Sequence, residues 1–212
     1  MSKMKSQTQR GTSLVELSVA SFLLMILLGL SYLTLVEGVD KQNGLRDEVG
    51  LQQDALALMA RISRETAEGH SSTFWPDRTV DAPLATPGDE LLGFVFLSPR
   101  DDHGRVRIDP SNNHPIWQKR VCYYYEPADR KVYRCEEPLA APSSAPPPRD
   151  DTKTTDWFQA NTLSDPLPGH VEDFVVRVGS EQEHLQFNAS FTTIRGQKKK
   201  TLEFISSTTI KN

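Results

Sequence analysis

The feature that most constrains this chain of 212 residues is a run of twenty residues, 17–36, that contains no charged residue and no proline. Twelve of the twenty are Leu, Ile, Val or Phe. At about 1.5 Å per residue, a helix of this length spans about 30 Å, which matches the hydrocarbon core of a bilayer. We therefore expect a transmembrane helix. The alternative, a buried core helix, is less favourable because helices of soluble proteins seldom stay apolar on every face over such a length.

Charges on either side of the run indicate its orientation. Lys3, Lys5 and Arg10 precede it without an acidic residue among them, whereas Glu37 and Asp40 follow it. Because basic residues are retained on the cytoplasmic side of a membrane, we expect the first ten residues in the cytoplasm and the chain beyond about residue 37 outside it. In a bacterial envelope protein, that outer side is oxidising.

The composition argues against several classes of function. The formal net charge is -4 and no Gly-rich phosphate loop is present, so we expect neither nucleic-acid binding nor nucleotide hydrolysis. The five histidines are scattered, and the sequence contains no HExxH or GxSxG motif. We therefore predict that the chain is not an enzyme and has no catalytic residues, no cofactor and no metal. The oxygen-rich residues 101–113 leave a calcium site open as an alternative to an ordinary polar loop.

The start of the apolar run carries a more specific signal. Gly11 stands where the basic leader meets the apolar stretch, and Glu16 follows five residues later. In this arrangement the sequence resembles the type IV prepilin family. The resemblance implies cleavage between Gly11 and Thr12 by a prepilin peptidase, N-methylation of Thr12, and a role for Glu16 in subunit assembly, through the N-terminal amine of a neighbouring subunit.

Two points qualify this resemblance. A carboxylate beside hydrocarbon is costly, so Glu16 requires a partner cation, unless it reaches back to the headgroups. The family usually begins its mature chain with Phe, so Thr12 departs from the pattern. This departure bears on the methylation more than on the cleavage, which depends mainly on Gly11.

Beyond the membrane, the helix is expected to continue to about residue 67, with Gly69 as a natural stop. Five apolar residues recur at steps of four, seven, three and three, which places them on one helical face that we expect to pack on the head: Leu45, Val49, Leu56, Met59 and Ile62. The expected domains are a leader peptide at 1–11, a transmembrane and assembly helix at 12–37, a helix continuation at 38–69 that packs on the head, and a globular β-rich head at 70–212.

Residues 121–125 and 131–135 flank a proline-bearing turn and predict a β-hairpin. If the turn is centred between Ala128 and Asp129, Cys122 and Cys135 lie directly opposite each other. A disulfide between them is sterically possible at a non-hydrogen-bonded pair, and an oxidising exterior favours it. The alternative is two free buried thiols.

The rest of the head is expected to be strands and loops. Residues 91–97, 171–178, 185–194 and 201–210 have the patterns of strands. The Pro-rich stretch 136–165 predicts an extended, mobile loop whose far end is pinned by Trp157 and Phe158; a polyproline-type ligand is the alternative. The predicted fold class is α+β, with a long N-terminal transmembrane helix packed on an antiparallel β-sheet head, the layout of type IV pilins.

Short matches in the head, at residues 121–125, 132–134, 170–176 and 210–212, resemble the minor pilins of the W type and the J-type pseudopilins of type II secretion. This resemblance implies a single-pass protein of the bacterial inner membrane with a cytoplasmic N-terminus and a periplasmic head. It then joins the tip of a type IV pilus (a fimbrium) or a type II secretion pseudopilus, which it primes or caps. The expected partners are prepilin peptidase, other minor and major pilins or pseudopilins, and the inner membrane. The alternative is an unprocessed, signal-anchored envelope protein whose head binds an extracellular ligand or adhesion target.

Overall fold

The computed structural model describes residues 14–69, 75–76, 90–148, 150, 152–178, 184–195 and 198–209. The chain divides into two compact units, Met1–Asp47 and Glu48–Asn212. In chain order, the described elements are α1 (Leu14–Ala67), β1 (Trp75–Pro76), β2 (Glu90–Leu91), β3 (Gly93–Ser98), β4 (Trp117–Glu126), β5 (Lys131–Ser143), α2 (Thr155–Asn161), β6 (Ser164–Pro166), β7 (Val171–Val178), β8 (His184–Arg195) and β9 (Lys198–Thr209).

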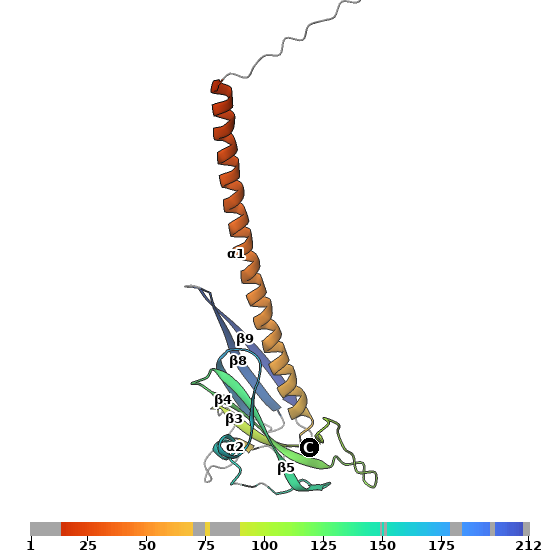
Figure 1. The fold of residues 1–212 in the computed structure, drawn as a ribbon. Helices are drawn as coiled ribbons and strands as arrows, with labels where there is room; N and C mark the ends of the chain where they lie inside the picture. The colour runs from red at the N-terminus through yellow and green to blue at the C-terminus, as the bar shows by residue number, and fades with distance from the viewer. Residues whose placement is uncertain are drawn as a thin grey trace, which may run out of the picture. The chain divides into compact units, whose positions relative to one another are not determined.

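Helix α1 is one unbroken helix of 54 residues, drawn from red to orange in Figure 1. Its many Leu, Met and Ala residues have high helix propensity, and this offsets the cost of about 1 kcal/mol at each of Gly38, Gly44 and Gly50. The helix ends in a turn in which the N–H of Gly69 donates to the carbonyl of Thr66 at 3.0 Å. This extent agrees with the predicted helix from residue 14 to about residue 67.

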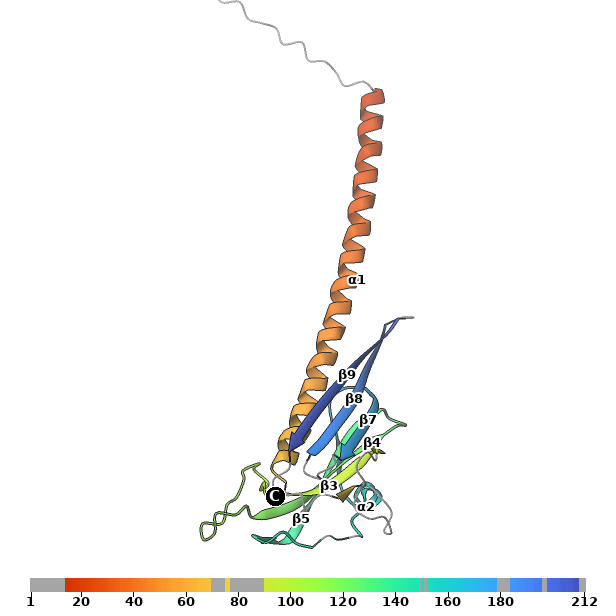
Figure 2. The same ribbon diagram turned by 180° about the vertical axis from the view of Figure 1, so that it is seen from behind.

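The strands form two antiparallel sheets. The first sheet has the order β1-β3-β4-β5-β6 and the second has the order β2-β7-β8-β9. Figure 2 shows three strands of the second sheet, β7, β8 and β9, in blue and side by side. The fold class is therefore α+β, with one long apolar N-terminal helix and antiparallel sheets. The predicted strand 171–178 is confirmed, and the lysines at 198–200 begin β9.

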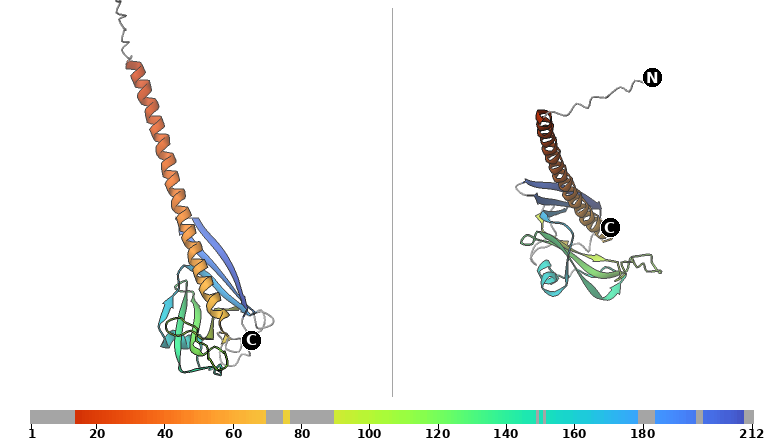
Figure 3. Two further views of the ribbon diagram at one scale, coloured as in Figure 1. Left: turned by 90° about the vertical axis from the view of Figure 1, so that its right-hand side faces the viewer. Right: turned by 45° about the horizontal axis from the view of Figure 1, so that its top comes forward.

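Both faces of the first sheet are covered. One face lies against the second half of α1 and the second sheet, and the other lies against α2; in the right-hand view of Figure 3 the green strands lie between the two helices. Alternate residues of β3 therefore serve different cores: Phe94 and Phe96 belong to the first, whereas Val95 and Leu97 belong to the second. This double coverage explains why every residue of β3 is buried and why residues 94–97 form an unbroken apolar run.

The two cores differ in size. The larger core contains residues of α1, β3, β4, β5, β7 and β8, with Leu202 and Phe204 of β9 packed against it. The smaller core lies between the first sheet and α2, and consists of Val95, Leu97, Trp117, Cys122, Tyr124, Cys135 and Phe158, with Tyr133, Leu139 and Trp157 at its margin.

The face of α1 that packs on the head is not the predicted one. Met59 and Ile62 are buried, as expected, but Leu45, Val49 and Leu56 are 63%, 49% and 59% exposed. The buried face is instead Leu51, Ala55, Leu58, Met59, Ile62, Glu65 and Thr66. Because Leu45, Val49 and Leu56 follow the same helical period, the apolar pattern alone does not distinguish the two faces.

The Pro-rich stretch 136–165, predicted to be a mobile loop, is in part regular. Strand β5 continues to Ser143, and α2 and β6 follow. Strand β6 pairs with β5 only up to Cys135, so β5 is an edge strand beyond this point. Pro138, opposite Lys119, is tolerated there because no neighbouring strand needs the backbone N–H that proline lacks. The expected anchoring of this stretch is confirmed for Phe158, which is fully buried.

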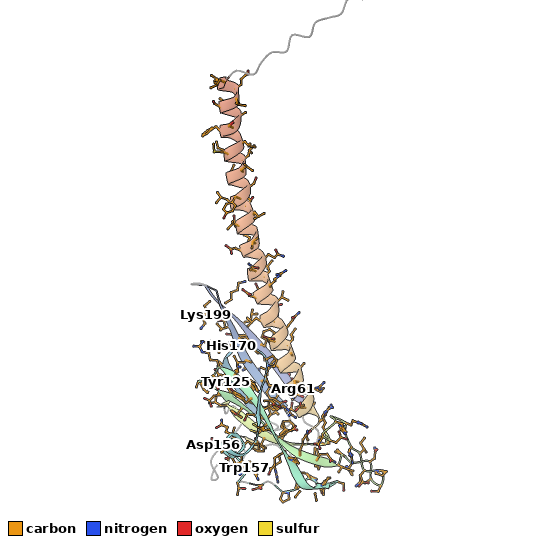
Figure 4. All side chains as sticks on the ribbon, in the orientation of Figure 1. Arg61, Tyr125, Asp156, Trp157, His170 and Lys199 are labelled. Carbon is orange, nitrogen blue, oxygen red and sulfur yellow. The ribbon has the colours of Figure 1, made fainter. Side chains whose placement is uncertain are left out.

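Tyr125 joins the two sheets. Its hydroxyl donates to the carbonyls of Val171 and Glu172 on β7, at 3.0 and 2.8 Å, and the N–H of Val171 donates to the carbonyl of Arg130 at 2.9 Å. Figure 4 shows where Tyr125 lies in the head. These bonds fix β7 beside the β4–β5 hairpin.

Candidate functional site

The first part of α1 is the clearest candidate for a functional segment. Between Leu14 and Val36, large apolar side chains are exposed on every face of the helix, and Figure 4 shows them projecting around it. The helix is long and apolar enough to cross a membrane. Because exposing so much apolar surface to water is unfavourable, this segment is a candidate membrane span.

Glu16 lies in the first turn of α1 and is the only charged residue between positions 14 and 36. The helix dipole is positive at this end and stabilises a carboxylate. The hydroxyls of Ser18 and Ser21 donate to the carbonyls of Leu14 and Leu17, at 2.9 and 2.8 Å, and so are satisfied within the helix as an apolar medium requires. The predicted cleavage and methylation positions, Gly11 and Thr12, lie outside the described residues.

A cluster of charged side chains joins α1 to the first sheet. Glu65 on α1 accepts from the guanidinium of Arg134 on β5 at 3.0 Å and from Arg61 at 3.3 Å. Arg134 and Lys119 both donate to Glu136 at 2.8 Å. Glu65, Lys119 and Arg134 are buried. Because removing one member leaves a buried charge unpaired, at a cost of about 3–5 kcal/mol, the cluster fixes which face of α1 meets β5.

Burial and pairing shift the pKa values in this cluster. Burial alone raises the pKa of Glu136, but hydrogen bonds from Lys119 and Arg134 outweigh it and hold that pKa below its ordinary value. Burial likewise opposes the charge of Arg134, but its carboxylate partners, Glu65 foremost, raise its pKa. Burial, together with the charge of Glu65, raises the pKa of the Tyr123 hydroxyl far above its ordinary value. None of these three shifted groups is therefore set to exchange a proton near neutral pH.

The two cysteines lie where the sequence placed them. Cys122 on β4 is the register partner of Cys135 on β5, and both side chains are buried in the smaller core. The predicted pairing register is therefore confirmed. The structure carries both residues as thiols, and the disulfide stays a prediction.

The pair, however, is not of the kind at which the sequence analysis considered a disulfide sterically possible. The N–H of Tyr125 donates to the carbonyl of Leu92, so odd-numbered residues of β4 bond toward β3 and even-numbered ones toward β5. The N–H of Leu167 donates to the carbonyl of Val132, so even-numbered residues of β5 bond toward β6 and odd-numbered ones toward β4. Cys122 and Cys135 therefore occupy a hydrogen-bonded pair, not the non-hydrogen-bonded pair that a cross-strand disulfide favours.

Two hydroxyl groups lie beside these thiols. The sulfur of Cys135 is 3.1 Å from the hydroxyl oxygen of Ser164, its register partner on β6. The hydroxyl of Tyr124 in turn donates to the Ser164 oxygen, also at 3.1 Å. The smaller core thus contains a short chain of polar groups that ends at Cys135.

The carboxylates of the oxygen-rich segment 101–113 stabilise the turns of that segment. Asp101 accepts from the N–H groups of His103 and Arg105, both at 2.9 Å, and these bonds, that of Arg105 foremost, lower its pKa. Asp109 accepts from the hydroxyl and the N–H of Ser111, which likewise lower its pKa. Among the described residues, no three His, Cys, Asp or Glu side chains gather as a metal site requires.

Sequence reasoning missed the charge cluster and helix α2. Glu65 and Arg134 are separated by 69 positions in the sequence, so no local sequence pattern predicts that they pair. Helix α2 has only seven residues, too few for a helical period to be recognised, although Thr154 does have the residue type that caps helices and accepts from the N–H of Trp157.

Comparison of the chain with protein-family models, with curated proteins and with solved structures gave no match.

Proposed function

We propose that the chain is a minor pilin or pseudopilin of the type IV prepilin family. A prepilin peptidase removes residues 1–11, Thr12 becomes the methylated N-terminus, and the apolar part of α1 holds the protein in the inner membrane with its head in the periplasm. The subunit then assembles through α1, at the tip of a type IV pilus or of a type II secretion pseudopilus, which it primes or caps.

The observation that carries this proposal is the make-up of α1. A single continuous helix begins with an apolar segment that is exposed on all faces and has Glu16 in its first turn, and it ends with a segment buried in a β-rich head. Lipid first, and neighbouring helices afterwards, provide the apolar surroundings that the first segment needs. An α+β layout of this kind is compatible with the type IV pilin fold.

The head supports a low copy number. Its first sheet is flanked by the irregular segment 99–116 and by the Pro-rich end of β5. Such projections hinder the tight helical packing of many identical subunits. They therefore favour a subunit present in a few copies over a major pilin.

The mass of the exported protein tests the proposal. The full chain is produced in a bacterium that has a prepilin peptidase, purified from the membrane and weighed. We expect a mature protein without residues 1–11, whose loss of Lys3, Lys5 and Arg10 changes the net charge from -4 to -7 (-4 minus 3). The variant Gly11→Leu should remain uncut, whereas Gln9→Leu, two positions away, should still be processed. An intact N-terminus on the exported wild type overturns the proposal and favours the signal-anchored alternative.

The role of Glu16 has a separate test. In Glu16→Ala the chain loses the carboxylate that would pair with a neighbour's N-terminal amine, so we expect recovery in pili or pseudopili to fall at least about tenfold, the equivalent of about 1.4 kcal/mol. The head, followed by circular dichroism, should remain folded. Glu37→Ala, which removes an exposed carboxylate at the other end of the apolar run, should assemble normally. Normal assembly of Glu16→Ala contradicts the assigned role.

A further inference from the structure

The smaller core contains a pair of thiols whose placement does not suit a permanent disulfide. Cys122 and Cys135 are the only cysteines of the chain, they face each other on neighbouring strands, and both are buried. We propose that they form a reversible thiol–disulfide pair, which a disulfide-bearing oxidant closes and ordinary small thiols reopen. The inference concerns the head alone and does not require that the protein be a pilin.

The hydrogen-bonded register is the first argument. Opposed Cβ atoms on neighbouring antiparallel strands lie about 4.5–5.5 Å apart, and hydrogen-bonded pairs have the larger separations. A relaxed disulfide needs Cβ atoms about 3.5–4.5 Å apart. Closing the bond between Cys122 and Cys135 therefore requires their Cβ atoms to move toward each other, at a pair whose backbones are held by ladder hydrogen bonds. The strain makes the disulfide easier to reduce.

The neighbourhood of Cys135 is the second argument. Ser164 and Tyr124 form a chain of hydroxyl groups that ends 3.1 Å from its sulfur. The Ser164 hydroxyl can donate to the Cys135 sulfur while it accepts from Tyr124. Cys135 lies on β5, next to the edge strand β6, whereas Cys122 lies on β4, between β3 and β5. Cys135 is therefore assigned as the thiol that meets the oxidant first and Cys122 as the one that resolves the intermediate.

The exchange proceeds in two balanced steps. The Cys135 thiolate attacks one sulfur of the oxidant's disulfide, which forms a mixed disulfide and releases the other half of the oxidant as a thiolate. The Cys122 thiolate then attacks the Cys135 sulfur, which forms the internal disulfide and releases the second half. Two thiols of the protein lose two protons and two electrons in all, and one disulfide of the oxidant becomes two thiols.

Access to the sulfurs depends on the segment that covers them. Phe158 on α2 is fully buried in the same core, and β6 pairs with β5 through only three residues. Helix α2 has only seven residues, and the edge strand β6 has only three, so both segments have few backbone hydrogen bonds. Such segments open locally at low free-energy cost. Opening of residues 155–166, without unfolding of the larger core, exposes the pair.

A redox titration of the full chain in detergent micelles tests the reversibility. The protein is equilibrated with oxidised and reduced glutathione in varied ratio, the remaining thiols are alkylated, and the products are weighed. We expect the internal disulfide in excess oxidised glutathione and its complete opening in excess reduced glutathione, without denaturant. A disulfide that survives excess reduced glutathione is a permanent cross-link, and a dithiol that persists in excess oxidised glutathione is inert; either result overturns the proposal.

Single variants test the order of the two thiols. In Cys122→Ser, the intermediate cannot be resolved, so a glutathione adduct on Cys135 should accumulate. In Cys135→Ser, the adduct on Cys122 should form at least about tenfold more slowly, the rate factor that corresponds to about 1.4 kcal/mol. Equal rates in the two variants overturn the assignment of Cys135 as the first to react.

Thiol labelling of the native protein tests the covering segment. Phe158→Ala should speed the alkylation of Cys135 about tenfold or more, because it weakens the packing of α2. Phe174→Ala removes an equally buried ring from the larger core and serves as the matched control for a general loss of stability. If both variants speed labelling equally, access requires global unfolding and the local opening is ruled out.

Discussion

Gly169, a residue between β6 and β7, shows how tightly the head is built around single positions. Its φ is +95°, and a Cβ there would lie 3.1 Å from the ring of Phe191 and 3.2 Å from the Cβ of Asp54. A left-handed backbone conformation costs a residue other than glycine about 1–2 kcal/mol, and overpacking costs about 1–3 kcal/mol more. Gly169 thus permits both the turn and the close approach of α1 to β8.

We predict that Gly169→Ala lowers the free energy of unfolding by about 2–5 kcal/mol, the sum of the backbone and packing costs. Gly104→Ala separates the two, because Gly104 also has a positive φ, of 74°, but no atom lies within 4 Å of the place that an alanine methyl group would take. It should cost only the backbone share, about 1–2 kcal/mol. Urea unfolding followed by tryptophan fluorescence measures both. Equal losses would show that the contact with Phe191 is unimportant.

At the scale of the elements, α1 has two apolar faces, and only one of them is used by the head. Leu58 is fully buried, whereas Leu56, two positions earlier, is 59% exposed. Truncation of a buried leucine leaves a cavity and costs about 2–5 kcal/mol, whereas a surface substitution usually stays within about 0.5 kcal/mol.

We therefore predict that Leu58→Ala lowers the free energy of unfolding by about 2–5 kcal/mol and that Leu56→Ala changes it by at most about 0.5 kcal/mol. Both changes are from Leu to Ala in the same helix, so helix propensity does not distinguish them. The measurement is urea unfolding of the full chain in detergent micelles. A large loss in Leu56→Ala would mean that this face also packs on the head.

The same helix shows what the sequence could and could not predict. The extent of α1 follows from a long apolar run and a terminal glycine, which are local signals. The choice of face does not, because Leu45, Val49 and Leu56 repeat with the same period as the buried residues. Which face is buried depends on partners far away in sequence, such as Arg134 for Glu65.

The hairpin gives a similar lesson. The opposition of Cys122 and Cys135 follows from the position of the turn, and the structure has that register. Whether an opposed pair is hydrogen-bonded depends on which way the ladder bonds point. That direction is visible only through the contacts of β4 with Leu92 and of β5 with Leu167. Sequence reasoning therefore located the thiols but not the character of their pairing.

On the scale of the whole molecule, the described carboxylates with shifted pKa values are all shifted in the same direction. Hydrogen bonds lower the pKa of Asp101, Asp109, Asp150 and Glu172, chiefly those from Arg105, Ser111, Thr152 and Lys199 respectively. In Glu136, burial acts in the opposite direction but is outweighed by Lys119 and Arg134. The folded head therefore binds fewer protons at these sites than the unfolded chain does at acidic pH.

This shared direction fixes the sign of the pH dependence. A carboxylate whose pKa is lower in the folded state contributes stability that is fully present above its unfolded pKa, 3.8 for Asp and 4.5 for Glu, and that is lost as the pH falls through the folded pKa. We predict that the free energy of unfolding, measured in urea, changes little from neutral pH to about pH 5 and then falls steadily toward about pH 3.

Glu136→Gln should be less stable than the wild type at neutral pH but should lose less stability on acidification, because Gln accepts from Lys119 and Arg134 without titrating. Lys41→Gln, which alters an exposed pair outside the head, should keep the wild-type slope. Stability that rises on acidification, or an unchanged slope in Glu136→Gln, contradicts the assignment of Glu136 as a stabilising anion of the head.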